Sequence, residues 1–180
     1  SSGAAWFGRL QTNGTWTAGR PFGVSGATCS SLARMDQGGF IAVGHEPLPN
    51  GNDTRATWWR LGPTGAPLAR WQFAGGPSSD FVDVTRSAAG TLFVIGHTNH
   101  KVSGRAALFA RVDRYGVETT TRVLSGATPR SLIGITWHPA GYIVATGGQS
   151  PTADPNAGTA PLVLSLDPWG HTSCEKAGKC

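Results

Sequence analysis

Residues 38–45, GGFIAVGH, and residues 90–97, GTLFVIGH, are two versions of one pattern, an apolar run closed by Gly-His. A third version, GYIVATGG at 141–148, keeps the glycine but lacks the histidine. The closing glycines recur at intervals of 52 and 51 residues: Gly44, Gly96 and Gly147. Short apolar runs bounded by glycine are typical of β-strands. The echo therefore predicts one strand of a structural repeat of about 50 residues.

A second series of glycines, in predicted turns, has the same period. Its members lie in QTNGT, GPTGA, DRYGV and DPWGH, at intervals of 51, 51 and 54 residues: Gly14, Gly65, Gly116 and Gly170. Glycine supplies the positive φ that a tight hairpin requires. Several strands in a repeat of about 50 residues are typical of propeller blades, which bury their faces only against neighbouring blades.

Each repeat accommodates four strands, named a, b, c and d in chain order. Strand a is expected to begin at Cys29, Phe81 and Leu132, and strand b to cover 40–43, 92–95 and 142–145. Strand c is expected at 6–10, 57–61, 107–112 and 162–166, and strand d at 15–22, 68–73, 118–124 and from 171 onward. The sequence thus predicts an all-β chain, a β-propeller of about three and a half four-stranded antiparallel blades. The expected divisions are a half blade at 4–24, blades at 27–76, 77–126 and 127–170, and a cysteine-containing segment at 171–180.

One face of the expected c strands carries an aromatic residue followed two positions later by arginine. The pairs are Phe7 and Arg9, Trp58 and Arg60, and Phe109 and Arg111. The fourth repeat departs from this pattern with Val163 and Ser165. The arginines can face a ligand, or their stems can cover aromatic rings between adjacent blades. We favour the second interpretation, which is structural.

The repeat units resemble the β-propeller repeats of bacterial secreted and cell-surface proteins, in which a glycine-bounded apolar strand precedes an L-x-K-L-D-x-x-G strand and hairpin. This second element occurs as FARVDRYG at 109–116 and VLSLDPWG at 163–170, with weaker versions FGRLQTNG at 7–14 and WRLGPTG at 59–65. The resemblance covers nearly the whole chain. It implies a recognition or scaffold module, because such repeats share no catalytic motif.

The expected first blade has only strands c and d, whereas propellers close with about 4 to 8 blades. Unpaired strand edges would then be exposed. We therefore expect the chain to be a fragment of a larger propeller that another polypeptide completes. Two copies of the chain would each offer strands c and d, and neither would supply the missing a and b.

The composition is that of a globular chain, since 39% of the 180 residues are hydrophobic and 14% are charged. The net charge of +5 comes from basic residues that are dispersed along the sequence, so we expect no nucleic-acid ligand. No apolar run approaches the roughly 18 residues of a membrane span. The chain begins Ser-Ser-Gly-Ala-Ala, with neither methionine nor a signal peptide, and we expect a trimmed product.

The chain contains three cysteines. Cys174 and Cys180 flank EKAGK and are expected to close a small disulfide loop. Their segment resembles the start of cysteine-rich modules that follow propellers in secreted bacterial proteins, which implies an extracellular or cell-surface location. Cys29 aligns with Phe81 and Leu132, so we expect a buried thiol there. No Cys-x-x-Cys pair or ligating histidine spacing is present, and we expect neither a metal nor another cofactor.

Motifs of catalysis are missing from the sequence. His45 and His97 are equivalent, but the third repeat has Gly148 at this position, which argues against a ring of metal ligands. Neither a Gly-x-Ser-x-Gly nucleophile elbow nor a Gly-x-x-x-x-Gly-Lys phosphate loop occurs, so we assign no catalytic residue. Loops on a rigid scaffold are the usual carriers of binding, and the d–a and b–c loops of a propeller emerge on one rim. The polar candidates on this rim are His45, Glu46, Asp53, Asp80, His97, Asn99, His100 and Arg130.

Three functions remain open. The first is a non-catalytic secreted or surface module that recognises a protein or a glycan and is completed by another polypeptide. The second is a structural subunit of an extracellular assembly, which pairs its open blade edge with a neighbour. The third is part of a hydrolase or lyase whose site is shared with missing blades. The first two are favoured because the sequence shows no convergent set of acid, base or metal ligands.

Overall fold

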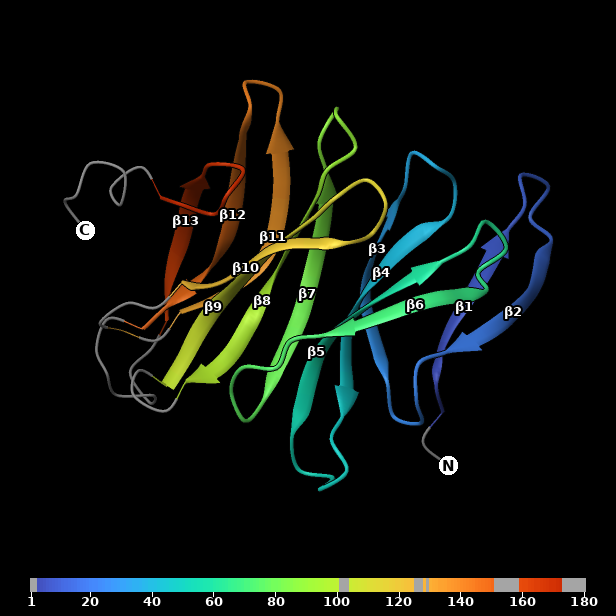
Figure 1. Cartoon of the computed structure of the whole chain (residues 1–180), viewed down its shortest axis with the longest axis horizontal. Coiled ribbons are helices and arrows are strands. Elements are labelled where there is room, and N and C mark those ends of the chain that lie inside the picture. The colour runs from blue at the N-terminus through green and yellow to red at the C-terminus, as the bar shows by residue number, and fades with distance from the viewer. Residues whose placement is uncertain (1–2, 101–103, 125–127, 129, 151–158, 173–180) are drawn as a thin grey trace.

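The computed structural model describes residues 3–100, 104–124, 128, 130–150 and 159–172. These residues form four antiparallel β-sheets of two, four, four and three strands, which we call sheets I to IV in chain order. The sheets lie side by side and do not close into a ring within the described part of the chain (Figure 1). The predicted all-β fold of propeller blades is therefore confirmed. No helix long and apolar enough to cross a membrane occurs among the described residues.

Consecutive strands pair in every sheet, so each sheet is a simple meander. Sheet I contains β1 (Ala5–Leu10) and β2 (Trp16–Phe22), and sheet II contains β3 (Thr28–Arg34), β4 (Phe40–Pro47), β5 (Thr54–Leu61) and β6 (Pro67–Gln72). Sheet III contains β7 (Ser79–Arg86), β8 (Leu92–His100), β9 (Gly104–Val112) and β10 (Glu118–Leu124). Sheet IV contains β11 (Arg130–His138), β12 (Tyr142–Gln149) and β13 (Ala160–Leu166).

The observed strands match the four-strand repeat. Strand a corresponds to β3, β7 and β11, strand b to β4, β8 and β12, strand c to β1, β5, β9 and β13, and strand d to β2, β6 and β10. Strands b extend beyond the expected residues, and β4 ends at Pro47 rather than at Val43. Strand d of sheet IV is represented by one bridge between Leu166 and Thr172, and residues 173–180 lie outside the described part of the chain.

The glycine that closes each b strand is required by a close backbone approach. The pairing register of strand a shifts at the same place in sheets II, III and IV, between Cys29 and Ser31, Phe81 and Asp83, and Leu132 and Gly134. Such a bulge bends strand a against strand b. A Cβ added at Gly44, Gly96 or Gly147 would lie 1.9 Å from a carbonyl oxygen of strand a. The closing glycines, at intervals of 52 and 51 residues, thus mark a β-bulge that recurs in three sheets.

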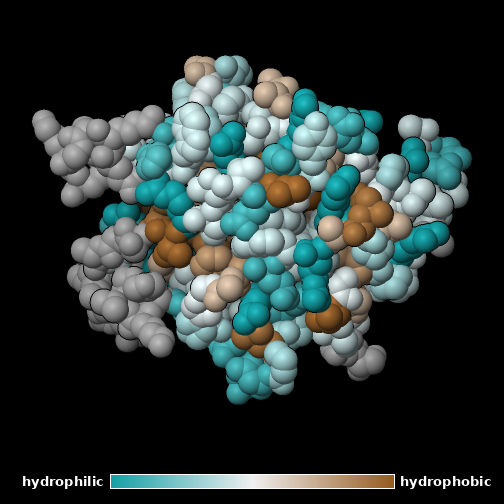
Figure 2. All heavy atoms as spheres, viewed as in Figure 1, coloured by the Kyte–Doolittle hydropathy of each residue, from teal (hydrophilic) through white to brown (hydrophobic). Residues whose placement is uncertain are grey.

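The apolar cores lie between consecutive sheets, because alternate residues of a strand point to opposite faces. On β8, Leu92 and Val94 pack toward sheet II, and Phe93 and Ile95 pack toward sheet IV. We call the face toward the preceding sheet the leading face and the opposite one the trailing face. A middle sheet is buried on both faces. On the side viewed in Figure 2, apolar side chains form only separate patches among polar ones.

The hairpin glycines contact the c strand of the preceding sheet. A Cβ added at Gly65 would lie 2.1 Å from the ring of Phe7, and one added at Gly170 would lie 2.5 Å from the ring of Phe109. The guanidinium of Arg111 lies 5.6 Å from the ring centroid of Trp169, in the same hairpin as Gly170. For this pair, the structural interpretation of the aromatic and arginine pattern is confirmed, since the cation covers a ring of the next sheet.

The prediction that Cys29 is a buried thiol is wrong, because this free cysteine is exposed. Phe81, at the equivalent position of β7, is fully buried in the core between sheets II and III. Sheet II supplies inner strands that cover the leading face of β7. Sheet I has only strands c and d, so no inner strand among the described residues covers the same face of β3.

Candidate functional site

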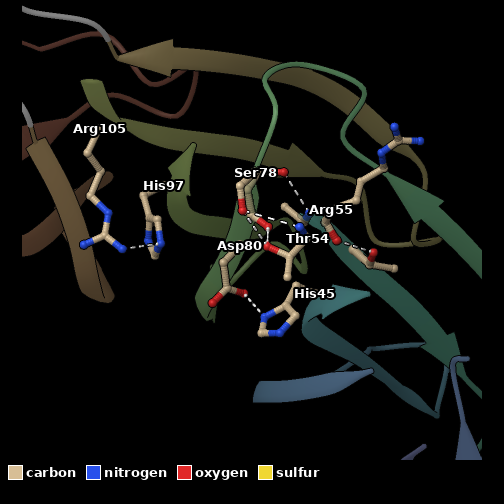
Figure 3. Close-up of polar contacts among 10 residues, drawn as sticks. His45, Thr54, Arg55, Ser78, Asp80, His97 and Arg105 are labelled. Atoms are coloured by element: carbon tan, nitrogen blue, oxygen red, sulfur yellow. Dashed lines mark hydrogen bonds and ion pairs between the residues drawn. The ribbon is translucent and has the colours of Figure 1, made fainter. Parts of the chain in front are cut away.

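The rim where the d–a and b–c loops emerge brings three of the predicted side chains together. His45 lies near the end of β4, Asp80 near the start of β7, and His97 on β8 directly opposite Asp80 in the pairing register. His45 Nδ1 lies 3.2 Å from Asp80 Oδ1, so this contact joins sheets II and III (Figure 3). Each side chain of the pair is about one-quarter exposed, 24% for His45 and 23% for Asp80.

Arg105, which the sequence reasoning missed, extends this group. An NH2 group of its exposed guanidinium lies 2.8 Å from His97 Nε2 (Figure 3). Because a guanidinium only donates hydrogen bonds, Nε2 must accept and the proton of neutral His97 is placed on Nδ1. That Nδ1 is buried and has no hydrogen-bond partner among the described residues. We call His45, Asp80, His97 and Arg105 the rim cluster.

The pKa values of the two histidines in the rim cluster are shifted in opposite directions. The polar contact with Asp80 raises the pKa of His45 above its ordinary value, against the opposing effect of burial. Burial, followed by the nearby charge of Arg105, lowers the pKa of His97. The cluster therefore combines an imidazole whose pKa is lowered, an imidazole whose pKa is raised by Asp80, and a permanently charged guanidinium.

A His–Asp pair of this kind can orient a general base, provided that a nucleophile is within its reach. Among the described residues, no hydroxyl or thiol hydrogen-bonds to His45. In the same part of the chain, no three His, Cys, Asp or Glu side chains are placed to hold a metal ion. The geometry of the rim cluster therefore suits noncovalent recognition, with donors and acceptors at one exposed place.

The loop that precedes β7 is held by hydroxyl groups. Thr54 Oγ1 lies 3.0 Å from Ser78 Oγ and donates to the carbonyl oxygen of Ser79 at 3.0 Å (Figure 3). Ser79 Oγ accepts a hydrogen bond of 2.9 Å from the backbone N–H of Ala56. These contacts fix the start of β7 against β5 and so position Asp80 beside His45. Single hydroxyl residues in a loop gave no distinctive sequence signal.

Glu46 has a structural environment. It is 1% exposed, and four donors reach its carboxylate: Val24 N, Trp59 Nε1, Arg70 NH1 and Gln72 Nε2, at 3.3, 3.2, 2.9 and 2.7 Å. Buried charge of this kind is tolerated because all its partners are present. The structure therefore places Glu46 inside the blade, where it ties the loop before β3 to strands β4 to β6.

The position of Glu46 is repeated in the next two sheets. Two residues after each closing glycine stand Glu46, Thr98 and Gln149. Thr98 Oγ1 donates to the carbonyl oxygens of Gly75 and Ser78, and Gln149 Nε2 donates 2.8 Å to Thr128 Oγ1. Each residue of the series thus holds the d–a loop that leads into strand a of its own sheet. A polar residue at a fixed distance from the repeated glycine was the signal from which this role could be read.

The other four predicted residues are spread along the rim. Asp53 Oδ2 accepts a hydrogen bond of 2.9 Å from Asn50 Nδ2 within its own turn. Asn99 is exposed. His100 ends β8 opposite Gly104, and its side chain is outside the described part. Arg130 begins β11, and its Nε is buried without a hydrogen-bond partner among the described residues. Cys174 and Cys180, the predicted disulfide, also lie outside the described residues.

Asp83, on the bulge of β7, joins three inner strands. Its Oδ1 accepts a hydrogen bond of 2.7 Å from Ser31 Oγ of β3, and its Oδ2 accepts one of 3.0 Å from the backbone N–H of Ile135 of β11. Because both neighbouring sheets supply these donors, this half-buried carboxylate serves the packing of the inner strands.

No family model and no curated protein matches the sequence. Two solved structures show a partial likeness to this chain. A hydrazine synthase chain of Kuenenia stuttgartiensis is 12% identical, with a TM-score of 0.49, over 86% of this chain and 54% of that one. A protein of unknown function from Bacteroides caccae is 11% identical, with a TM-score of 0.34, over 95% of this chain and 90% of that one. This chain spans about half the length of the hydrazine synthase chain.

Proposed function

We propose that this chain is a non-catalytic β-propeller module that recognises a protein or glycan ligand at the rim cluster, in a ring completed by another polypeptide. The observation that carries the proposal is the convergence of the rim cluster from β4, β7, β8 and β9 of two neighbouring sheets. Rigid strands hold these side chains, and the exposed Arg105 leaves donors available to a ligand. A location outside the cell or at its surface is part of the same proposal, supported by the repeat resemblance.

Two probes test the recognition function. A glycan array presents carbohydrate ligands, and a displayed peptide library presents protein ligands. We expect a ligand from one of them to bind, and Arg105→Ala or His97→Ala to weaken its binding in calorimetry. Arg114→Ala is the matched control, because Arg114 contacts Tyr115 in the hairpin between β9 and β10. No ligand from either probe, or equal affinity for all variants, would contradict the proposal.

The structural-subunit function is favoured by a separate observation, the apolar surroundings of β1 and its edge, which no other strand in the described part of the chain pairs with. Trp6 and Leu10 of this strand are 65% and 63% exposed. A structural subunit would keep its assembly when the rim cluster is removed. The double variant His45→Ala, Arg105→Ala can be produced in the natural source of the chain. If this variant still assembles, and no ligand binds in either probe, the second function is favoured.

A further inference from the structure

A groove with a volume of about 520 Å³ separates sheet I from sheet II. One wall is residues 7–10 of β1. The other is built from β3, the turn after it, the first residue of β4 and the hairpin after β5: Leu32, Arg34, Gly38, Gly39, Phe40 and Pro63. Among the described strands β1 pairs only with β2, so the edge of β1 that faces away from β2 is free. The unpaired N–H and C=O groups of such an edge are a template for an added strand.

The middle sheets show which element occupies this place when a repeat is complete. In sheet III, β8 pairs with β9, and its Phe93 and Ile95 share a core with Leu132 of β11. Strand b therefore lies between strand c of its own sheet and strand a of the next sheet. The groove between β1 and β3 has the same neighbours, strand c of sheet I and strand a of sheet II.

The exposed residues of β3 are those that such a strand would cover. Leu32 of β3 is 45% exposed, whereas Val84, at the equivalent position of β7, is 8% exposed. Val84 is covered by Ile41 and Val43 of β4, the b strand of the preceding sheet. Cys29 is exposed on the same face of β3 as Leu32, although it does not itself line the groove.

We propose that this groove is a strand-addition site for an inner β-hairpin with the pattern of strands a and b of this same repeat. The hairpin pairs its b strand with β1 and packs alternate apolar side chains over Leu32 and Cys29. This inference deepens the ring-completion part of the proposed function and is independent of the ligand at the rim.

A second copy of the chain does not supply this hairpin. Each of its b strands, β4, β8 and β12, is already paired on both edges within its own sheet. Donating one of them would require a complete sheet to open. The occupant is therefore an a–b hairpin other than the three inner pairs of the described sheets, and its b strand has the continuous apolar pattern of FIAVG or LFVIG.

The test extends the full chain with a hairpin of its own repeat. A copy of residues 79–103 is placed directly before residue 2, which preserves the spacing that the 79–112 segment has in sheet III. Cys29 is the reporter, and its alkylation by iodoacetamide is followed by peptide mass spectrometry. We expect Cys29 to react several-fold more slowly in the extended chain than in the original. The 79–100 peptide, added free, should slow the reaction in a saturable manner.

Paired substitutions separate groove occupation from a general change. Leu32→Gln in the extended chain should restore fast alkylation of Cys29. Leu68→Gln, at an exposed leucine of β6 that does not line the groove, should leave the protection intact. Equal alkylation rates in the original and extended chains, or protection that survives Leu32→Gln, would overturn the inference. Protection that grows with the concentration of the original chain alone would also overturn it, because a second copy would then occupy the groove. None of these outcomes depends on ligand binding at the rim.

Discussion

Leu61 of β5 and Leu10 of β1 occupy the same repeat position in neighbouring sheets, but only one of them is buried. Leu61 is 1% exposed and Leu10 is 63% exposed. Sheet I covers the leading face of β5, with Ala5 and Phe22 in the shared core, and no described sheet covers that face of β1. A blade of this repeat therefore becomes buried only through its neighbours.

The opposite end of the array shows the same effect on the trailing face. Phe109 of β9 is fully buried against sheet IV, whereas Val163, its counterpart on β13, is 69% exposed. The sequence changes with the position, since the aromatic residue and the arginine become Val163 and Ser165. The trailing end has therefore lost the apolar pattern, while the leading end keeps Trp6 and Leu10.

The largest effect should come from the leucine pair. Leu61→Ala leaves a cavity in the core between sheets I and II and should lower the free energy of unfolding by about 2–5 kcal/mol. Leu10→Ala removes an exposed side chain and should change it by less than about 0.5 kcal/mol. Urea unfolding of both variants measures the difference. Similar losses in the monomeric chain would mean that Leu10 is buried after all.

The second effect compares two glycines of strands b. A methyl group at Gly96 would press on the carbonyl oxygen of Asp80, so Gly96→Ala should cost about 3 kcal/mol. Gly148, in sheet IV, has ordinary contact space around an added Cβ, with the nearest atom, Thr159 Cβ, at 3.5 Å. Gly148→Ala should therefore have little effect on the thermal midpoint. A tolerated Gly96→Ala would show that the bulge can relax.

The glycines explain how far the sequence could predict the structure. The two glycine series carried the period and the order of the strands, because hairpin turns require glycine. The bulge that faces each closing glycine was not predicted and is a finding of the structure. The exposure of Cys29 could not be predicted in the same way. Its alignment with Phe81 assumed a complete preceding blade, and burial depends on a neighbour that no local pattern describes.

The candidate site was predictable only in part. His45 and His97 were identified from the echo, and Asp80 from its place on the rim. Their convergence depends on the packing of sheet II against sheet III, and Arg105 joins through a strand pairing that spacing alone does not reveal. Glu46 was assigned to the rim by its position, although its partners on β5 and β6 place it inside the blade.

A third, smaller effect concerns the contact between sheet II and the loop that leaves sheet I. Glu46→Gln keeps the shape of the side chain but sets an amide N–H₂ against buried donors, so it should cost about 2 kcal/mol. Asp53→Asn, in an exposed turn of the same b–c connection, should cost much less. Chemical denaturation of the two variants measures this difference, and equal costs would show that the Glu46 network is not formed.

The smallest effects concern the two histidines, which share a repeat position but not a protonation behaviour. The pKa of His45 should lie above 6.5 and that of His97 below it, as read from imidazole resonances in an NMR titration. Asp80→Asn should lower the pKa of His45, because its main cause of elevation is removed and burial remains. Equal pKa values for the two rings would contradict the geometry of the rim cluster.

These shifts have opposite consequences for stability. The raised pKa of His45 gives a contribution that is complete below the unfolded value of 6.5 and is lost as pH rises through the folded value. The lowered pKa of His97 makes its protonation destabilising as pH falls from 6.5 through its folded value. His45→Gln should therefore reduce stability more in mild acid than in mild alkali, and His97→Gln should improve it in mild acid.

Amide hydrogen exchange of the free, monomeric chain examines the dependence of each sheet on its neighbours. If neighbouring sheets supply the stability, the amides of β8 and β9, covered on both faces, should exchange slowest. The amides of β1, β2 and β13 should exchange fastest, because one face of their sheets is open. Equal protection of β1 and β9 in the monomer would contradict the view that a blade of this repeat is stabilised by the blades beside it.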